Sequence, residues 1–353
     1  MKIKLAILDS DVCYLARIVS VFNEKYADKL EIHSFSEEAV ALEALEKSRI
    51  DMFLAADEFE IDVEKLPKKC GFEYFVEKND IETVRNQITI SKYQKAEQIY
   101  KQLLGIYSEH AAGISGSRFS DHECSVIAFA SPCGGVGTST MAAACALRQN
   151  MLGKRVFYLN LCMYDAVDCF FSGEGQFDFS DIIYALKSKK TNIALKIESC
   201  VKQDASGVSF FSQPKVALDM MELEEEEIET LLSNLRLSGN YDVIVVDVKL
   251  DLSEKTIRLY ERMDAIVTVS NGTDIANAKL MRMYDALTIK EQSMDYSILN
   301  RMMIVYNQFS NKGGAVLEHI GLKSLGGAPR YEHASVKLVV EQLAAKEFWN
   351  GIL

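Results

Sequence analysis

Residues 126–147 read VIAFASPCGGVGTSTMAAACAL, and they join three elements in order. The apolar start predicts a buried strand, and the end predicts a helix from Thr138 to about Met151. The turn between them contains three glycines, which are Gly134, Gly135 and Gly137. Because glycine has no Cβ atom, backbone N–H groups in such a turn can converge on a phosphate, and the helix N-terminus adds partial positive charge. The stretch therefore predicts a phosphate-binding loop.

Short apolar runs alternate with helical patterns on both sides of this loop. Strands are expected at residues 4–8, 30–33, 52–55, 73–76 and 88–91, and then at 125–130, 156–159, 208–211, 243–246, 265–270 and 303–307. Alternation of this kind is typical of βαβ units and of parallel sheets that are buried on both faces. The sequence therefore predicts an α/β protein.

A chain of 353 residues is long enough for about two domains. The segment SEHAAGISGSRFSDHE at 108–123 is small, polar and without periodicity, which favours a linker. We expect a first domain at residues 1–107, a linker at 108–122 and a second domain at 123–353.

The charge of the chain argues against a basic binding domain. Residues 1–115 hold 15 basic and 21 acidic residues and the remainder holds 24 and 30, so each part carries −6. Proteins that neutralise DNA phosphates or lie on anionic bilayers usually carry a basic domain or tail. The eight cysteines form no CxxC pair, and no apolar run approaches about 18 residues, so we expect reduced thiols in a cytoplasmic protein.

The glycine-rich loop resembles the deviant Walker A loop of ParA and MinD ATPases, which reads KGGVGKTT where this chain reads CGGVGTST. Cys133 and Thr138 stand at the two lysine positions. The resemblance implies ATP and Mg²⁺ as ligands, with Ser139 as a metal ligand. It also implies that ATP contacts these loop residues: Gly134, Gly135, Val136, Gly137, Thr138, Ser139 and Thr140. Loss of both lysines removes charge-assisted hydrogen bonds, so we expect ATP binding with slow hydrolysis or none.

Further motifs of that family follow in order. Asn160 and Cys162 occupy the positions of an Asp-x-Asp motif, and Asp165 is the nearest carboxylate that could compensate. The resemblance places Asp247, at the end of YDVIVVD, beside the metal. It places Asn307 at the adenine, and Pro329 and Tyr331 on a loop that covers the base. Together these motifs imply a P-loop NTPase fold with a mostly parallel sheet.

The first domain resembles a response-regulator receiver, which has a flavodoxin-like fold. Asp9 and Asp11 lie near the position of its acidic pair, and Lys92 occupies the position of its lysine. The phosphoacceptor position aligns with Ala56, and Asp57 comes one residue late. Because side chains alternate between the faces of a strand, that offset misdirects the carboxylate. We expect a receiver that is not phosphorylated and that binds other proteins.

The combination of these two domains resembles the TadZ/CpaE family, which localises Tad (Flp) pilus assembly machinery. This resemblance implies an ATP-binding localisation and scaffold protein, a homodimer, pilus and secretion proteins as partners, and a place at the cell pole. It gives no strong sign of nucleic acid or direct membrane binding. The alternatives are an active ParA/MinD-type partition or positioning ATPase and a response regulator with an ATPase output domain.

Two apolar stripes bear on these alternatives. In the acidic run 221–232 the stripe consists of Met221, Leu223, Ile228 and Leu231, and it favours a helix with one solvated face. In the C-terminal segment the stripe consists of Val336, Val339, Val340 and Leu343, and we expect it to pack on the second domain's core rather than on lipid. Trp349 alone does not distinguish a membrane anchor from a core residue.

Overall fold

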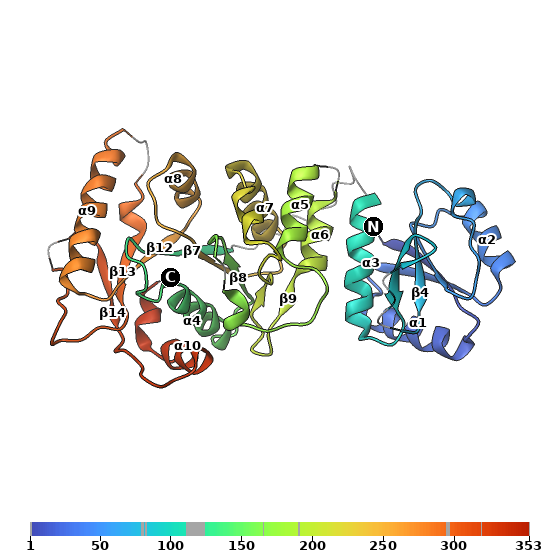
Figure 1. The fold of residues 1–353 in the computed structure, drawn as a ribbon, viewed down its shortest axis with the longest axis horizontal. Coiled ribbons are helices and arrows are strands. Elements are labelled where there is room, and N and C mark those ends of the chain that lie inside the picture. The colour runs from blue at the N-terminus through green and yellow to red at the C-terminus, as the bar shows by residue number, and fades with distance from the viewer. Residues whose placement is uncertain are drawn as a thin grey trace. The chain divides into compact units, whose positions relative to one another are not determined.

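The computed structural model describes residues 2–78, 81, 83–110, 124–164, 166–189, 191–293, 297–318 and 320–352. Two compact units are formed, each around one sheet (Figure 1). Unit 1 comprises Met1–Gly116 and Ser188–Cys200, and unit 2 comprises Ser117–Lys187 and Val201–Leu353.

Unit 1 contains a six-stranded sheet of order β2-β1-β3-β4-β6-β5. Its strands are β1 (Ile3–Leu8), β2 (Leu30–Phe35), β3 (Met52–Ala56), β4 (Gly71–Val76), β5 (Thr83–Val84) and β6 (Gln87–Ser91). Its helices are α1 (Val12–Tyr26), α2 (Glu38–Lys47), the 3-10 helix η1 (Val63–Lys65), α3 (Ala96–His110) and α6 (Ile193–Cys200). Neighbouring strands are parallel, except that β5 and β6 form a hairpin. The predicted flavodoxin-like arrangement is confirmed.

Successive strand residues of unit 1 enter two different cores, because side chains alternate across a sheet. Leu54 and Phe75 face one core, which also receives Phe22 of α1 and Leu103 of α3. Phe53 lies in the other core, on the face covered by α2. Burial on both faces explains why these strands appear as continuous apolar runs in the sequence.

Glu73 is an exception within β4, where it pairs with Leu54 and is 6% exposed. Its Oε2 atom has no hydrogen-bond partner among the described residues. Burial, and then the negative charge of Glu109, raise the pKa of Glu73 to about 8. A carboxyl group in this position is neutral in the folded protein well above the pH at which it ionises in the unfolded chain.

Glu73→Gln is expected to remove a pH dependence from unit 1. Because the folded pKa lies above the ordinary 4.5, the stability contributed by the proton is present below about pH 4.5 and is lost as the pH rises through about 8. The wild type should lose about 1.4 kcal/mol of unfolding free energy per pH unit in this window, and the variant should not. Urea unfolding at pH 6 and pH 8, followed by far-UV circular dichroism, measures the difference. Equal slopes for both proteins would contradict the assignment.

Helix α6 joins unit 1 although its sequence lies far beyond the first domain expected from the sequence. Asn192 donates its N–H to the Ser108 carbonyl at 2.9 Å, and Leu195 packs against the core beneath α3. Glu198 accepts a hydrogen bond from the Tyr100 hydroxyl at 3.3 Å and forms an ion pair with Lys29. The fold of unit 1 is therefore completed by a helix from the second half of the chain.

Unit 2 contains an eight-stranded sheet of order β14-β13-β12-β7-β11-β8-β10-β9. Its strands are β7 (Ser125–Ala130), β8 (Val156–Asn160), β9 (Lys202–Gln203), β10 (Ser209–Phe210), β11 (Val243–Asp247), β12 (Ala265–Ser270), β13 (Met302–Tyr306) and β14 (Lys323–Gly327). Its α-helices are α4 (Thr138–Met151), α5 (Phe179–Ser188), α7 (Glu225–Leu237), α8 (Glu254–Glu261), α9 (Asp274–Glu291) and α10 (Val336–Ala344). Its 3-10 helices are η2 (Val167–Cys169), η3 (Ala217–Met221), η4 (Leu299–Arg301) and η5 (Glu347–Gly351). Only β9 runs antiparallel to its neighbour among these strands, so the predicted mostly parallel sheet is confirmed.

Helices α4 and α10 pack against one face of this sheet, opposite α7 and α8 (Figure 1). Val340 and Leu343 are buried there, as the C-terminal stripe predicts, whereas Val336 is exposed. Trp349 is a core residue, 1% exposed, and its indole N–H donates to the Leu343 carbonyl at 2.7 Å. In the part of the chain that the structure describes, no helix is long and apolar enough to span a bilayer.

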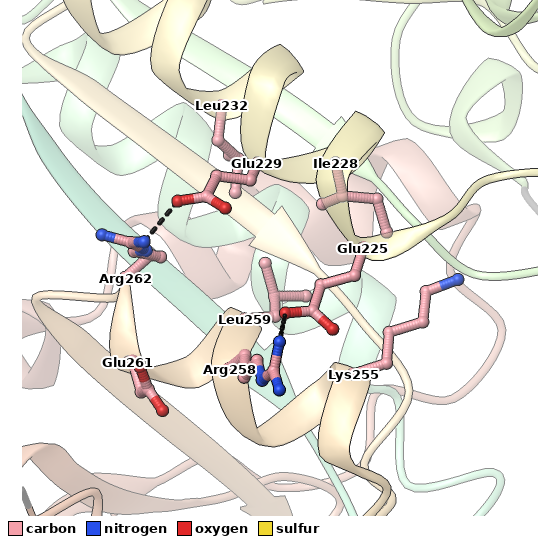
Figure 2. Close-up of a pocket in the computed structure, with 9 residues that line it drawn as sticks. All are labelled: Glu225, Ile228, Glu229, Leu232, Lys255, Arg258, Leu259, Glu261 and Arg262. Carbon is pink, nitrogen blue, oxygen red and sulfur yellow. Dashed lines mark hydrogen bonds and ion pairs between the residues drawn. The ribbon is translucent and has the colours of Figure 1, made fainter. Parts of the chain in front are cut away.

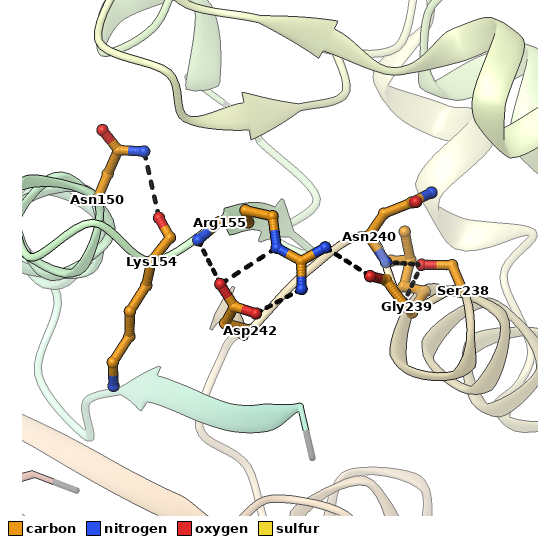
Figure 3. Close-up of polar contacts among 8 residues, drawn as sticks. Asn150, Lys154, Arg155, Ser238, Gly239, Asn240 and Asp242 are labelled. Atoms are coloured by element: carbon orange, nitrogen blue, oxygen red, sulfur yellow. Dashed lines mark hydrogen bonds and ion pairs between the residues drawn. The ribbon is translucent and has the colours of Figure 1, made fainter. Parts of the chain in front are cut away.

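A double ion pair fixes the register between β8 and β11 (Figure 3). The Arg155 guanidinium binds both carboxylate oxygens of Asp242, at 2.6 and 3.3 Å, and donates to the Gly239 carbonyl at 2.6 Å. The Arg155 N–H also donates to Asp242 at 2.7 Å. At the other end of the same two strands, this register places Asn160 directly beside Asp247.

Several expectations differ from the structure. α3 continues to His110, three residues into the segment expected as a linker, and residues 111–123 lie outside the described residues. The strand expected at 208–211 is reduced to the two residues of β10. Met221, expected in a buried stripe, is 63% exposed because it ends η3 before α7 begins.

Candidate nucleotide site

The glycine-rich loop lies between β7 and α4 and is held at its first residue. The Ser131 hydroxyl donates to the Val269 carbonyl of β12 at 2.7 Å and accepts the Cys133 N–H at 3.0 Å. Gly135 and Gly137 have φ of +76° and +81°, a region that favours glycine. Gly137 is also the N-cap of α4, so the first N–H groups of the helix have no partner within the helix and point toward the loop.

Gly137 has a second reason to lack a side chain. A Cβ atom there would lie 2.4 Å from Nδ2 of Asn307, which comes directly after β13. That same amide donates to the Val136 carbonyl at 2.8 Å. Asn307 therefore holds the loop in place through a hydrogen bond to its backbone. The sequence alone did not indicate this contact.

The described loop residues differ in what they can offer a nucleotide. Val136 is 2% exposed and its side chain belongs to the core, so only its backbone is available. Thr138, Ser139 and Thr140 form the first turn of α4 and are partly exposed. Backbone N–H groups and hydroxyl groups are the donors that bind phosphate oxygens at a helix N-terminus.

Cys133, at the first lysine position, does not extend out of the loop. Its side chain is buried, and Sγ lies 3.8 Å from the Ala276 carbonyl of α9. Burial raises the pKa of this thiol above its ordinary value, so it remains uncharged. A neutral, inward-facing thiol cannot replace an ammonium group that interacts with phosphate.

Asp247 ends β11 at the centre of the site and is 1% exposed. It accepts hydrogen bonds from the Tyr158 hydroxyl at 3.2 Å and from Asn160 Nδ2 at 3.3 Å. Burial raises its pKa to about 6, and hydrogen bonds with Ser139, Tyr158 and Cys162 partly oppose that increase. The hydroxyl of Ser139 thus lies beside the Asp247 carboxylate.

These two oxygen donors fit a magnesium ion. Mg²⁺ in phosphate sites takes one or two protein oxygens together with substrate phosphates and water. No group of three or more His, Cys, Asp or Glu side chains could hold a metal among the described residues. Ser139 and Asp247 would therefore hold Mg²⁺ only as part of a nucleotide complex, in which the ion would neutralise phosphate charge and the buried carboxylate.

Four residues predicted for the site remain, and these are Asn160, Asp165, Pro329 and Tyr331. The Asn160 side-chain oxygen accepts the Cys162 N–H at 2.8 Å, and its amide N–H donates to Asp247, so both polar groups of this side chain have partners at the end of β8. Asp165 lies outside the described residues. The segment with Pro329 and Tyr331 follows β14, whose end adjoins Tyr306 directly before Asn307.

The sequence interpretation did not include Tyr158 or Ser131. Tyr158 lies two residues before Asn160 on β8, so the two side chains share one face of the strand. That alternation was a usable signal, but the partner Asp247 is 89 residues away and becomes a neighbour only through strand order.

Asp247→Asn is expected to stabilise the nucleotide-free protein and to remove Mg²⁺-dependent ATP binding. Because the pKa of Asp247 is higher in the folded protein than in the unfolded chain, proton binding to Asp247 adds to the free energy of unfolding. This contribution is fully present below about pH 3.8 and is lost as the pH rises through about 6. At pH 7.5 the ionised carboxylate should cost about 3 kcal/mol, which asparagine avoids. Thermal melts followed by Trp349 fluorescence, with EDTA or with Mg·ATP, test both parts. Asp168→Asn, at an exposed site on η2, is the matched control, and equal melting of both variants would contradict the assignment.

In unit 1, both residues of the predicted acidic pair, Asp9 and Asp11, bind other groups of the protein. Lys92 Nζ lies 2.7 Å from Asp9 Oδ2, with side chains 7% and 1% exposed. Asp11 caps α1 by accepting the Tyr14 N–H at 2.9 Å. Ala56 is fully buried at the end of β3, and Asp57 is the next residue after the strand. The carboxylate nearest the end of β3 along the chain is therefore that of Asp57, one residue beyond the aligned phosphoacceptor position.

The fold of unit 2 is that of the ParA-type ATPases. The structure of a ParA family ATPase from Chlorobium tepidum is 18% identical to this chain, covers 65% of it and 96% of its own length, and gives a TM-score of 0.51. Two MinD structures are also similar. The structure of MinD from Aquifex aeolicus is 16% identical, covers 63% of this chain and 95% of its own length, and gives a TM-score of 0.47. The structure of MinD from Pyrococcus horikoshii, complexed with Mg-ADP, is 12% identical, covers 63% of this chain and 94% of its own length, and gives a TM-score of 0.48.

Residues 1–108 match the family model described as the TadZ-like receiver domain. No curated protein matched the chain. The chain thus consists of a TadZ-like receiver domain followed by a domain of the ParA/MinD ATPase fold, and the predicted combination is confirmed.

Proposed function

We propose that this protein is an ATP-binding scaffold for Tad pilus assembly that hydrolyses ATP slowly or not at all. The observation that carries the proposal is the loop itself. Its two positive-φ glycines, the exposed start of α4 and the Ser139–Asp247 pair suit Mg·ATP, while positions 133 and 138 hold a buried thiol and a threonine. Without cations at these positions, the site can bind phosphates but lacks charge to stabilise transfer.

Two measurements test the two clauses. Calorimetric titration of the full chain with Mg·ATP should show binding, and a phosphate-release assay should show little or no turnover. Absence of binding at millimolar nucleotide would overturn the first clause. Turnover of about 1 per second or faster would overturn the second, and would favour an active positioning ATPase.

The double variant Thr138→Lys/Cys162→Asp is expected to raise phosphate release. It returns a cation to the start of α4 and a carboxylate two residues after Asn160, where Cys162 Sγ lies 3.9 Å from the Asp247 carbonyl. The matched control is Thr138→Lys/Cys169→Asp, because Cys169 is exposed on η2. If both variants release phosphate equally slowly, the missing residues do not explain the deficit.

In this proposal the receiver domain binds other proteins and is not regulated by phosphorylation, because Ala56 stands at the phosphoacceptor position and Lys92 pairs with Asp9. The protein acts as a homodimer with pilus and secretion proteins at the cell pole. Sedimentation with and without Mg·ATP tests the dimer. A fluorescent fusion in cells with and without the pilus genes tests the location, and a uniform distribution in cells that carry those genes would contradict it.

A further inference from the structure

Four large apolar side chains of unit 2 are exposed close to one another, and we call them the apolar patch. They are Tyr184 of α5 and Val216, Leu218 and Met221 in or beside η3, with exposed fractions of 72%, 51%, 61% and 63%. Soluble proteins usually scatter such residues singly, and a contiguous group of them marks a binding surface.

Two hydrogen bonds join the elements that carry the patch. The Ser180 hydroxyl of α5 donates to Asp219 of η3 at 2.6 Å and accepts the Lys215 N–H at 3.1 Å. Tyr184 lies one turn beyond Ser180 on α5, so its side chain is on the helix face whose Ser180 bonds η3. Met220, 8% exposed, anchors η3 to the core and leaves Leu218 and Met221 directed outward.

The cations beside the patch already have partners. Lys187 of α5 pairs with Glu227 of α7 at 3.1 Å, which also shows that these helices lie side by side (Figure 1). Lys215 pairs with Asp178 at 3.8 Å. These two lysines therefore contribute little net positive charge to the surface.

The acidic residues of α7 divide into two sets. On the side of α8, Glu225 pairs with Arg258 at 3.0 Å and Glu229 pairs with Arg262, across a groove whose floor includes Leu232 (Figure 2). Next to Met221 along the chain, three exposed glutamates form no ion pair in the part of the chain that the structure describes, and these are Glu222, Glu224 and Glu226. One cation lies among them, because Lys255 Nζ donates to the Leu223 carbonyl. With three carboxylates and one ammonium group, the segment beside the patch carries a net negative charge.

We propose that the apolar patch binds a basic amphipathic segment of another protein. Large apolar side chains of the segment would cover Tyr184, Leu218 and Met221, and its lysines or arginines would face the unpaired glutamates. The same negative charge disfavours anionic lipid and nucleic acid, whose phosphates it repels.

The test uses the full chain and a labelled amphipathic peptide of leucine and lysine at helical spacing. Binding measured by fluorescence polarisation should weaken by about tenfold in the triple variant Tyr184→Ser/Leu218→Ser/Met221→Ser. It should also weaken with salt. The matched control is Met151→Ser/Ile275→Ser/Ile289→Ser, which removes three apolar side chains exposed by 58%, 72% and 68% elsewhere on unit 2. Its affinity for the peptide should equal that of the wild type, and both variants should melt at the wild-type temperature.

Three results would overturn the proposal. The first is equal peptide affinity for the triple variant and the control, or equal affinity for a peptide with glutamate in place of lysine. The second is loss of self-association by the triple variant in sedimentation with unchanged peptide binding, which would assign the patch to a second copy. The third is loss of binding to phosphatidylglycerol vesicles without loss of peptide binding, which would assign it to a membrane.

Discussion

Replacing Lys92 with methionine is expected to destabilise unit 1 by about 3 to 5 kcal/mol, because it leaves Asp9 as a buried carboxylate without a counter-charge. Asp9 and Lys92 are nearly inaccessible to solvent, at 1% and 7% exposure, and their charged atoms are 2.7 Å apart. Besides this ion pair, the Asp9 carboxylate accepts the Asp11 N–H at 2.9 Å through its other oxygen, Oδ1. That single contact is too little to replace the ammonium group.

The measurement separates the two units. The chain has one tryptophan, Trp349, in the core of unit 2, so its fluorescence reports unit 2 while far-UV circular dichroism reports both units. Lys92→Met should shift only the dichroism transition, and adding Asp9→Asn should recover much of the loss. Lys101→Met is the matched control, because Lys101 pairs with the half-exposed Glu97 and should cost less than about 1 kcal/mol. An equal effect of Lys92→Met and Lys101→Met would contradict the role given to the buried pair.

The second large effect is expected at Gly137. Gly137→Ala would force a Cβ atom to 2.4 Å from Asn307 Nδ2 and hold an alanine at φ +81°. The clash breaks the hydrogen bond from Asn307 to the Val136 carbonyl, and the left-handed conformation costs roughly a further 1 kcal/mol. Affinity for Mg·ATP in calorimetric titration should fall by about 100-fold or more, or about 2.7 kcal/mol.

Gly153→Ala is the control that separates the effect of backbone strain from the effect of the clash with Asn307. Gly153 follows α4 at φ +82° with no atom within 4 Å of an added Cβ, so alanine there carries the strain without the clash. This control should lower stability slightly and leave ATP affinity unchanged. Adding Asn307→Ala to Gly137→Ala should not restore affinity, because the support of the loop is then lost altogether. Wild-type affinity in Gly137→Ala would show that the loop does not bind the nucleotide in this conformation.

The strands of both sheets were predictable where an apolar run was long enough to be buried on both faces, as in Val243–Asp247. β14 was not predicted, because its sequence KSLGG is polar, glycine-rich and largely exposed at the sheet edge. Met221 was assigned to the wrong surface because its spacing fits the helical stripe of α7, whereas η3 and α7 are separate elements with a break between them.

The candidate site was predictable in its local part. The loop and Ser139 are adjacent in sequence, so strand, turn and helix were sufficient to place them. Contacts across the sheet were not predictable, because Tyr158 meets Asp247 and Asn307 meets Val136 only through the strand order. The Lys92–Asp9 pair has the same origin, since 83 residues separate two positions that are adjacent only when β1 and β6 are both in place.

The placement of α6 limits how this protein could have been assembled from older parts. The TadZ-like receiver match ends at residue 108, yet Leu195 and Glu198, from between α5 and β9, pack on α3 and bond to Tyr100. A recombination event at the 108–122 segment would therefore transfer a receiver without one of its helices. The two parts of this chain are expected to be inherited together, and a transplanted receiver would need residues 188–200 supplied in the new host.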